Sequence, residues 1–356
     1  MRQPIGSPVP ASLPPDDART SRPLTEIYDV ALLDLDGVVY VGSEPVPGVS
    51  HMLASVRETG MRLAYVTNNA SRRASEVADL LAAMGVPVAV EDVVTSAQAA
   101  AHLLHERLVP GSAVLVVGTQ ALAEEVRGAG LTPVAVADPT PAAVVQGYGP
   151  NVGYRDLAEA TVAIRSGALW VVTNTDSTLP SPRGPLPGNG AMVAALKVAT
   201  GAVPTVVGKP QPGLLKESVE RTGARRPLVV GDRLDTDIEG AVAVGADSLL
   251  VLSGVTTPTL LLAAPAGQRP TYVAQDLGGL LRAHPAATVV DGTASCGDFV
   301  AHWDGAEIVL AGDGDEPLDA LRALCAANWA ADHPPAAVRA VDPAAAAALR
   351  TLGLAS

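Results

Sequence analysis

The most constraining feature of this 356-residue chain is an alternation of short apolar runs with segments of helical spacing. The run "YDVALLDLD" predicts a buried strand, "GVSHMLASVRETG" a helix and "MRLAYVTNN" a second strand. The alternation continues through a third short strand, "VEDVVTS", and the helix "AQAAAHLLHERL". Because strands that alternate with helices form right-handed crossover units, the sequence predicts an α/β fold on a parallel sheet.

The alternation restarts near Pro110 and forms a second, self-contained unit. This unit ends after the strand "ALWVVTNTD" in a Pro/Gly-rich loop and a helix, and further strands such as "RPLVVGD" then resume the first pattern. We therefore predict a core made of residues 25–107 and 201–284, interrupted by an inserted α/β cap domain at 108–200. We expect this cap to move relative to the core.

The two ends of the chain differ from the rest. Residues 1–24 are rich in Pro, Ser and Asp and lack the apolar segment of a secretory signal, so we predict a disordered tail. Residues 285–356 predict a small α+β module with a hairpin over "DFVAHWDGAEIVLAG", a helix, a strand and an Ala-rich helix. About seventy residues is small for an independent hydrophobic core, so we expect the module to pack against a neighbouring domain or a second subunit. A homodimer is a candidate assembly.

The charge balance limits the partners. Asp and Glu number 37 against 24 Lys and Arg, which gives a formal net charge of −13 and disfavours nucleic acid and anionic membrane as partners. No apolar run approaches the length that spans a bilayer, and we expect a cytoplasmic protein. The two cysteines, Cys296 and Cys325, provide no disulfide framework and are expected to be small buried hydrophobic residues.

Two acids follow the first predicted strand. Asp34 and Asp36 project to the same face, because side chains two residues apart in a strand lie on one side. They lie at the carboxyl end of the strand, where α/β sheets bind ligands. A solvated polar turn explains a single such pair as well. If the two carboxylates do converge, oxygen ligands alone favour a hard cation such as Mg²⁺.

Polar side chains at other strand ends weigh against a plain turn. Thr67, Asn68 and Asn69 end the second strand and offer a hydroxyl and two amides that can hold phosphate oxygens, although Thr-Asn also suits turns. Lys209 is a cation in the stiff segment "VVGKPQP". The joint pattern predicts a site for a phosphate group.

A later strand ends in "GDRLDTDIEGA". Asp232 ends that strand as Asp34 ends the first, and it would be a third carboxylate for a cation. Asp237 could instead cap the helix predicted over 238–244. Together these residues predict phosphomonoester hydrolysis, with Asp34 attacking phosphorus and Asp36 acting as general acid and later as base.

The segments "DLDGVVY", "YVTNNASR", "VVGKP" and "GDRLDTDI" resemble, in order and spacing, the four motifs of the haloacid dehalogenase (HAD) phosphohydrolases. "NTDSTLP" followed by "PGNGAMVAAL" resembles the NagD-like, 4-nitrophenylphosphatase-like branch, whose cap is of the larger α/β (C2) type. The resemblance covers roughly residues 28–283. It implies a Rossmann-like core and a Mg²⁺ cofactor.

The resemblance also implies roles for single residues. Asp34 would be the nucleophile and Asp36 the acid/base, while Thr67 and Lys209 would hold the phosphate. Mg²⁺ would be held by Asp34, the backbone oxygen of Asp36 and Asp232. Asp237 would lie in the next shell of residues.

The resemblance further implies a small phosphorylated metabolite as substrate. Pyridoxal-phosphate phosphatases of the branch carry a histidine about where Leu179 stands, which favours glycerol 3-phosphate, with phosphoglycolate or a broad range of sugar and 4-nitrophenyl phosphates as the alternative. The C-terminal module resembles the acetyltransferase-like appendage of bacterial glycerol-3-phosphate phosphatases. It lacks a glycine-rich pyrophosphate loop, so we expect no acetyl-CoA binding and a role in stability or assembly.

Three other functions fit the sequence less well. A haloacid dehalogenase would have little use for Thr67, Lys209, Asp232 and Asp36 as a phosphate site. A dinucleotide-binding oxidoreductase needs a G-x-G-x-x-G after the first strand, and "DLDGVVYVG" does not match it. A catalytically inactive phosphate-binding module is disfavoured by the intact Asp34 and Asp36.

Overall fold

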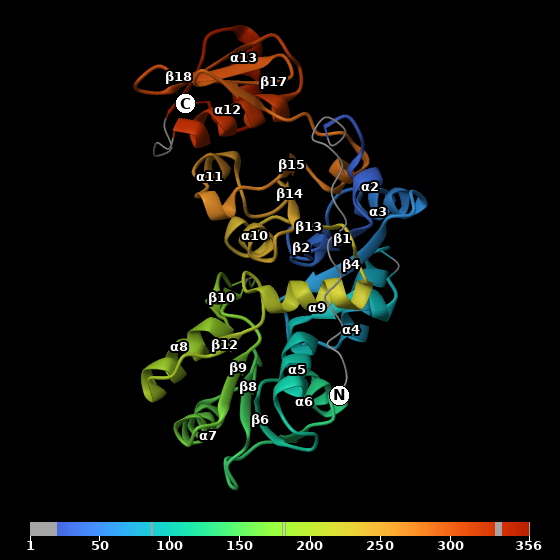
Figure 1. Cartoon of the computed structure of the whole chain (residues 1–356), viewed down its shortest axis with the longest axis vertical. Coiled ribbons are helices and arrows are strands. Elements are labelled where there is room, and N and C mark those ends of the chain that lie inside the picture. Colours follow the sequence, from blue (N-terminus) through green and yellow to red (C-terminus); the bar gives the residue numbers. More distant parts are fainter. Residues whose placement is uncertain (1–19, 87, 180, 182, 332–336, 356) are drawn as a thin grey trace, which may run out of the picture.

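The computed structural model describes residues 20–86, 88–179, 181, 183–331 and 337–355. Three bodies follow one another along its long axis, with the core between the inserted domain and the C-terminal module (Figure 1). Residues 1–19 of the predicted disordered tail lie outside the described residues, and helix α2 (Leu24–Ile27) begins at a buried leucine. Among the described helices, none is both long and apolar enough to cross a membrane.

The core sheet has six parallel strands in the order β15-β14-β13-β1-β4-β5, which confirms the predicted parallel sheet. Both of its faces are buried: Val30 and Leu32 of β1 belong to one apolar cluster, and Ala31 and Leu33 belong to another. This explains why the strand reads as a continuous apolar run. The strands are β1 (Val30–Leu33), β4 (Arg62–Thr67), β5 (Val93–Thr95), β13 (Pro227–Gly231), β14 (Asp247–Val251) and β15 (Tyr272–Ala274).

Helices cover both faces of this sheet, as expected for crossover units (Figure 1). Several begin at recognisable signals, such as Thr95, whose side chain accepts a hydrogen bond from the Gln98 amide, and Pro212 in the first turn of α9. A short hairpin of β2 (Tyr40–Val41) and β3 (Glu44–Pro45) follows β1. The helices are α3 (Val49–Glu58), α4 (Ala74–Ala83), α5 (Ser96–Arg107), α9 (Pro212–Thr222), α10 (Glu239–Val244) and α11 (Pro258–Leu262).

The inserted domain has its own parallel sheet, in the order β12-β9-β8-β6-β7. Its last strand, β12 (Thr205–Val206), lies beyond the boundary predicted at residue 200. A small hairpin, β10 (Thr178–Leu179) and β11 (Leu186–Pro187), leaves this domain toward the core. The other elements are β6 (Ala113–Val117), α6 (Gln120–Gly128), β7 (Thr132–Val134), β8 (Ala143–Gln146), α7 (Tyr154–Arg165), β9 (Leu169–Val172) and α8 (Asn189–Thr200).

One apolar cluster joins the core to the inserted domain. Leu32 of the core sheet and Leu104 of α5 share it with Leu122 of α6 and Val145 of β8. A cap that swings as a rigid body would have to slide on this buried surface or carry α5 with it. Mobility of the cap stays a prediction.

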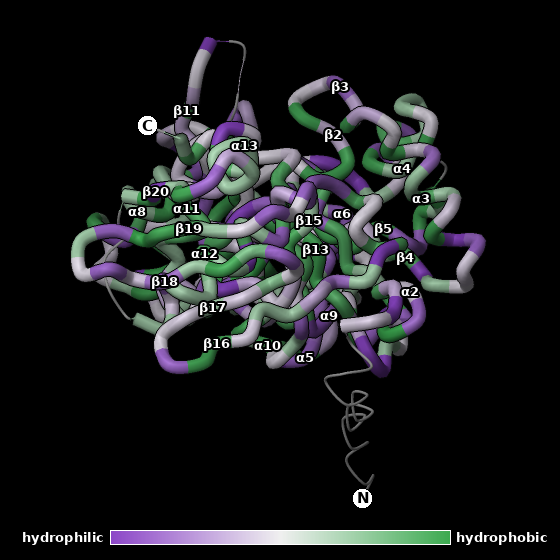
Figure 2. Tube along the Cα trace, turned by 90° about the horizontal axis from the view of Figure 1, so that it is seen from above, coloured by the Kyte–Doolittle hydropathy of each residue, from purple (hydrophilic) through white to green (hydrophobic). Residues whose placement is uncertain are grey.

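The C-terminal module is a five-stranded sheet, β16-β17-β18-β19-β20, backed by two helices. Figure 2 shows its strands side by side, with hydrophobic stretches along β18 and β19. The expected hairpin, helix, strand and Ala-rich helix are present, whereas the sequence did not predict β16 and β17. The elements are β16 (Thr288–Val290), β17 (Thr293–Cys296), β18 (Phe299–Trp303), β19 (Ile308–Gly312), α12 (Pro317–Ala331), β20 (Val338–Ala340) and α13 (Pro343–Thr351). Cys296 and Cys325 are free and buried, as expected.

Candidate active site

Three loops bring four charged side chains together at the carboxyl edge of the core sheet. Asp34 directly follows β1 and Asp232 directly follows β13, and these parallel strands are neighbours in register. The Lys209 ammonium lies 2.6 Å from Asp34 Oδ1 and 2.6 Å from Asp237 Oδ1. The strand ends therefore converge as predicted. No basic residue lies beside Asp34 and Asp36 in the sequence, and the cation that pairs with Asp34 is Lys209, from the segment after the inserted domain.

Glycines make room for the carboxylates. A Cβ on Gly254 would lie 2.0 Å from Asp232 Oδ2, and a Cβ on Gly37 would lie 2.3 Å from the same atom. Gly37 also has φ +81°, a conformation that other residues rarely adopt. The glycine after Asp36 in "DLDG" is thus required both by the turn and by the close approach of Asp232.

The carboxylates form a group that fits a hard cation. Oxygens of Asp34, Asp232 and Asp237 all lie within 4.8 Å of one another. Asp232 Oδ2 accepts a hydrogen bond from the Val255 amide at 2.6 Å, but Asp232 Oδ1 is buried without a hydrogen-bond partner among the described residues. Because an unsatisfied buried carboxylate oxygen is costly, this atom fits a metal ligand. Asp34 and Asp232 thus offer the oxygen ligands that suit Mg²⁺, whereas both oxygens of Asp237 accept hydrogen bonds from protein groups.

Asp36 is not in this group. The contribution predicted for it was its backbone oxygen, and that contact stays a prediction. Its side chain reaches solvent at the rim of the site, while its carboxyl group is partly enclosed. This enclosure raises the pKa of Asp36, opposed by the charge of Arg72 and by a hydrogen bond from the Tyr40 hydroxyl. A raised pKa favours the protonated form that a general acid needs.

Burial and neighbouring charges together set the pKa values of Asp34, Asp232 and Lys209. Burial raises the pKa of Asp34, and the Lys209 ammonium opposes that rise. Burial, followed by the charge of Asp237, raises the pKa of Asp232 to about 6. Burial alone would lower the pKa of Lys209, but the carboxylates of Asp237 and Asp34 outweigh it and raise that pKa. A bound divalent cation would favour the ionised form of the acids.

Asp237 does not cap a helix. The chain forms a single wide π-helical turn over Leu234–Ile238 before α10, and Ile238 occupies the cap position of that helix. Asp237 Oδ2 instead accepts a hydrogen bond from the Arg233 amide at 3.1 Å, and its other oxygen accepts from Lys209. The capping alternative is therefore wrong, and Asp237 fixes the position of the ammonium.

The polar residues at the end of β4 form hydrogen bonds within the protein. Thr67 is buried, and its hydroxyl accepts a hydrogen bond from the Asn69 amide at 3.1 Å. The Asn68 side chain binds both backbone groups of Lys209, accepting at 2.8 Å and donating at 3.1 Å. Asn69 Oδ1 accepts from the amide and hydroxyl of Ser71, both at 2.7 Å. Asn68 and Asn69 thus shape the loops here, and their contact with phosphate stays a prediction.

A cavity of about 250 Å³ opens beside Lys209, between the inserted domain and the core. Asp34 and Asp36 do not line it, so it reaches the site from the side of Lys209. Sequence reasoning assigned no role to Asp176 or Arg233, although both stand in quoted motifs, "NTD" and "GDR". The cavity is lined by Thr175, Asp176, Ser177, Thr178, Lys209, Pro210, Arg233, Asp235 and Thr236.

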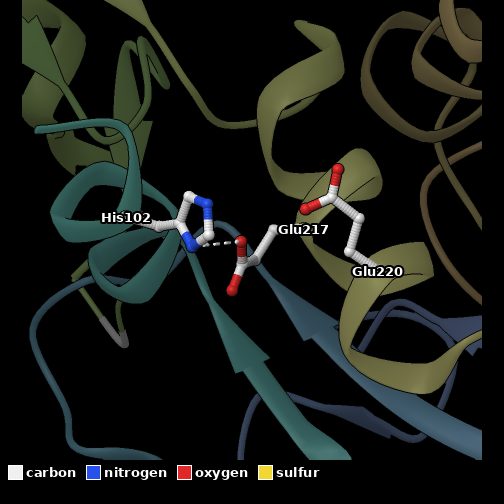
Figure 3. Close-up of side chains that lie close together, drawn as sticks. All are labelled: His102, Glu217 and Glu220. Carbon is white, nitrogen blue, oxygen red and sulfur yellow. Dashed lines mark ion pairs between the residues drawn. The ribbon is translucent and has the colours of Figure 1, made fainter. Parts of the chain in front are cut away.

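A second group of ionisable side chains shares no residue with this site. Figure 3 shows His102 of α5 facing Glu217 of α9, with Glu220 one turn further along α9. His102 Nδ1 lies 3.3 Å from a Glu217 oxygen, and its Nε2 lies 3.6 Å from Glu106. The group is largely exposed, and we interpret it as a polar surface contact that joins the two helices.

Comparisons with known proteins identify the family of this chain. The family described as "Haloacid dehalogenase-like hydrolase" matches residues 31–132, and a second one, described as "HAD-hyrolase-like", matches 206–280. A D-glycerol 3-phosphate phosphatase of Mycobacterium tuberculosis is 48% identical over 343 residues, covering 93% of this chain and 96% of that protein. This chain is a member of the HAD-like hydrolase family. The resemblance seen in the motifs is confirmed.

Other relatives define how far the HAD similarity extends. An acid sugar phosphatase of Staphylococcus saprophyticus is 35% identical, over 72% of this chain and 97% of its own. A crystal structure of a glycerol phosphate phosphatase from M. tuberculosis with magnesium covers 94% of this chain and all of its own, with 45% identity and a TM-score of 0.86. A p-nitrophenyl phosphatase from Archaeoglobus fulgidus covers 71% of this chain and 98% of its own, with 29% identity and a TM-score of 0.67. Residues 296–354 match a "GCN5-related N-acetyltransferase like domain", which confirms the resemblance of the C-terminal module.

Proposed function

We propose that this HAD hydrolase is a Mg²⁺-dependent phosphatase of small phosphomonoesters, with glycerol 3-phosphate as substrate. The observation that carries the proposal is the group of Asp34, Asp232 and Asp237 around Lys209, with one buried Asp232 oxygen unpartnered among the described side chains. Similarity to a glycerol 3-phosphate phosphatase over almost the whole chain supports the substrate. The polar lining and small volume of the cavity suit a short hydroxylated molecule.

The residues divide the reaction between them. An Asp34 carboxylate oxygen attacks phosphorus and forms an aspartyl phosphate, while the bond from phosphorus to the substrate oxygen breaks. Asp36 gives its proton to the departing oxygen and then takes a proton from the water that cleaves the intermediate. Lys209, held by Asp237, offsets the charge of the phosphoryl oxygens. When bound by the carboxylates, Mg²⁺ would add Lewis-acid stabilisation of that charge.

Metal removal tests the proposal directly. We expect the full-length protein to release phosphate from glycerol 3-phosphate with Mg²⁺, and to lose this activity in excess chelator. The Asp232→Asn variant should need at least about tenfold more Mg²⁺ for half-maximal activity, because it lacks a charged ligand. Parallel assays with phosphoglycolate, sugar phosphates and 4-nitrophenyl phosphate decide between the proposed substrate and the alternatives. Full activity in chelator would refute the metal dependence.

The role of Asp36 can be separated by leaving group. Asp36→Asn should lower turnover of glycerol 3-phosphate by about 100-fold to 10,000-fold, since an alkoxide leaves poorly without a proton. Release of 4-nitrophenol from its phosphate should fall much less in the first step, because nitrophenolate leaves without protonation. A burst of nitrophenol in rapid mixing would show this difference. Equal losses in the first step for both substrates would argue against Asp36 as the acid.

A cytoplasmic location and a homodimeric assembly stay predictions from the sequence. So does the exclusion of nucleic acid and membrane as partners.

A further inference from the structure

Helix α11 connects the C-terminal module to a proposed metal ligand. The segment just before it holds Asp232: the Val255 amide donates to Oδ2 at 2.6 Å, and the Thr256 amide donates to the Asp232 carbonyl at 3.2 Å. In the same segment, the Ser253 hydroxyl donates to the Gly37 carbonyl at 2.7 Å. The residues that lead into α11 thus fix both the acid after β13 and the loop after β1.

The other end of α11 is held by the module. Asn328 of α12 is buried, and its side-chain amide donates to the carbonyl of Leu262, the last residue of α11, at 2.7 Å. Leu261 and Leu262 also belong to the apolar cluster that contains Leu321 and Leu324 of α12. Figure 1 shows α12 lying against α11 at the junction of module and core.

Two further contacts fix α12 on the core. Arg322 donates to the Val273 carbonyl at 2.8 Å. The Arg269 guanidinium lies over the Trp329 ring, 5.3 Å from its centroid. The module therefore cannot shift relative to β15 and α11 without breaking buried contacts.

We propose that the C-terminal module positions Asp232 for the metal through α11, with Asn328 as the positioning residue. This inference rests on the proposed metal site. Helix α11 has five residues, too few to hold a helical turn without tertiary support. With both ends anchored, the Val255 amide stays on Asp232 Oδ2 and leaves Oδ1 without a protein partner, so that Oδ1 would be the oxygen that holds the cation. Groups that orient metal ligands in this way strongly affect metal affinity.

A residue next to Asp237 also belongs to the apolar cluster at the junction of module and core. Ile238, directly after Asp237, is fully buried in the apolar cluster shared with the module. The turn that carries Asp237 is therefore anchored in the same apolar cluster that contains Leu262 of α11 and Leu324 of α12. The module thus has a role in the chemistry beyond the stability or assembly role expected from sequence, and this role needs no acetyl-CoA.

The test is a pair of matched variants in the full-length chain. Asn328→Leu removes the amide that holds Leu262. Leu349→Ala creates a cavity in the same module, on α13, and lowers stability while the hydrogen bond from Asn328 to the Leu262 carbonyl stays in place. Calorimetric titration of Mg²⁺ into each protein gives the dissociation constant, and thermal unfolding gives the matched loss of stability. Asn328→Ala is the second variant if the leucine is not accommodated.

We expect about a tenfold weaker Mg²⁺ affinity for the Asn328 variant and an unchanged affinity for Leu349→Ala at a similar melting temperature. Equal affinities in both variants, or losses that follow melting temperature alone, would overturn the proposal. If the unaltered protein binds Mg²⁺ but releases no phosphate, the proposed function fails while the positioning test still gives its answer.

Discussion

Asp34→Asn should reduce phosphatase turnover on the order of 10⁴-fold or more while the protein stays folded. The substitution keeps the size of the side chain but replaces the attacking carboxylate oxygen with an amide, which is not a nucleophile at phosphorus. The fold should tolerate it, because Asn is neutral in a site where burial disfavours the charge of Asp34, and Lys209 keeps Asp237 as its partner.

The measurement combines turnover with detection of the intermediate. Acid quenching of the unaltered protein during turnover should trap a phosphoryl group on the peptide that contains Asp34, and the variant should show none. In heavy-oxygen water the label should appear in released phosphate and not in Asp34, since water attacks phosphorus. Asp79→Asn, the same change on an exposed face of α4, is the control and should be fully active. Turnover near normal in Asp34→Asn would exclude a covalent mechanism through this residue.

The convergence of Asp34 and Asp232 could be predicted because it depends only on regular structure. Parallel strands in register bring their carboxyl ends to one edge, so the residue after each strand is placed by the strand itself. The parallel sheet followed for the same reason from the alternation of elements. These are short-range patterns that the local sequence specifies.

The pairing of Asp237 with Lys209 could not be predicted in the same way. Asp just before a predicted helix favours capping, and only a π-helical turn, stabilised by tertiary contacts, moves Asp237 off that position. Asn68 likewise reads as a turn residue, whereas its partner, the Lys209 backbone, lies 141 residues away in sequence. Long-range contacts of this kind leave no local pattern.

Strand β16 could not be predicted from the sequence for a third reason. Its residues Thr288–Val290 are all exposed, so they lack the alternation of apolar and polar residues that marks a half-buried strand. The strand forms because β17 offers an edge for pairing across the turn at Asp291 and Gly292, both of which have positive φ. Pairing with a neighbour, and not burial, determines this element.

Lys209→Met should destabilise the protein and abolish its activity together. The side chain of Lys209 is 3% exposed, and it pairs with Asp34 and with Asp237, which is 1% exposed. Methionine fills similar space but leaves two buried carboxylates without their cation. Removing one partner of a buried ion pair costs about 3–5 kcal/mol in free energy of unfolding, because the remaining charge is uncompensated. Phosphate release should fall below detection, since the charge that offsets the phosphoryl oxygens is lost.

The destabilisation should depend on pH with a definite sign. Without the ammonium, burial raises the pKa of Asp34 further above its unfolded value of about 3.9. The folded variant therefore binds more protons than the unfolded chain, and its stability falls as pH rises through the range between the two pKa values. Denaturant unfolding in metal-free buffer should thus show a smaller deficit at about pH 5 than at about pH 9.

The exposed lysine of the neighbouring helix supplies the control. Lys216→Met on α9 removes the same charge and should change stability by no more than about 0.5 kcal/mol at either pH, because exposed charges contribute little. A Lys209→Met variant as stable as its parent at both pH values would mean that the Lys209 ammonium does not compensate buried carboxylate charge in the parent. Lys209 would then not be the residue that keeps Asp34 ionised for attack, and the mechanism would need the metal alone to do so.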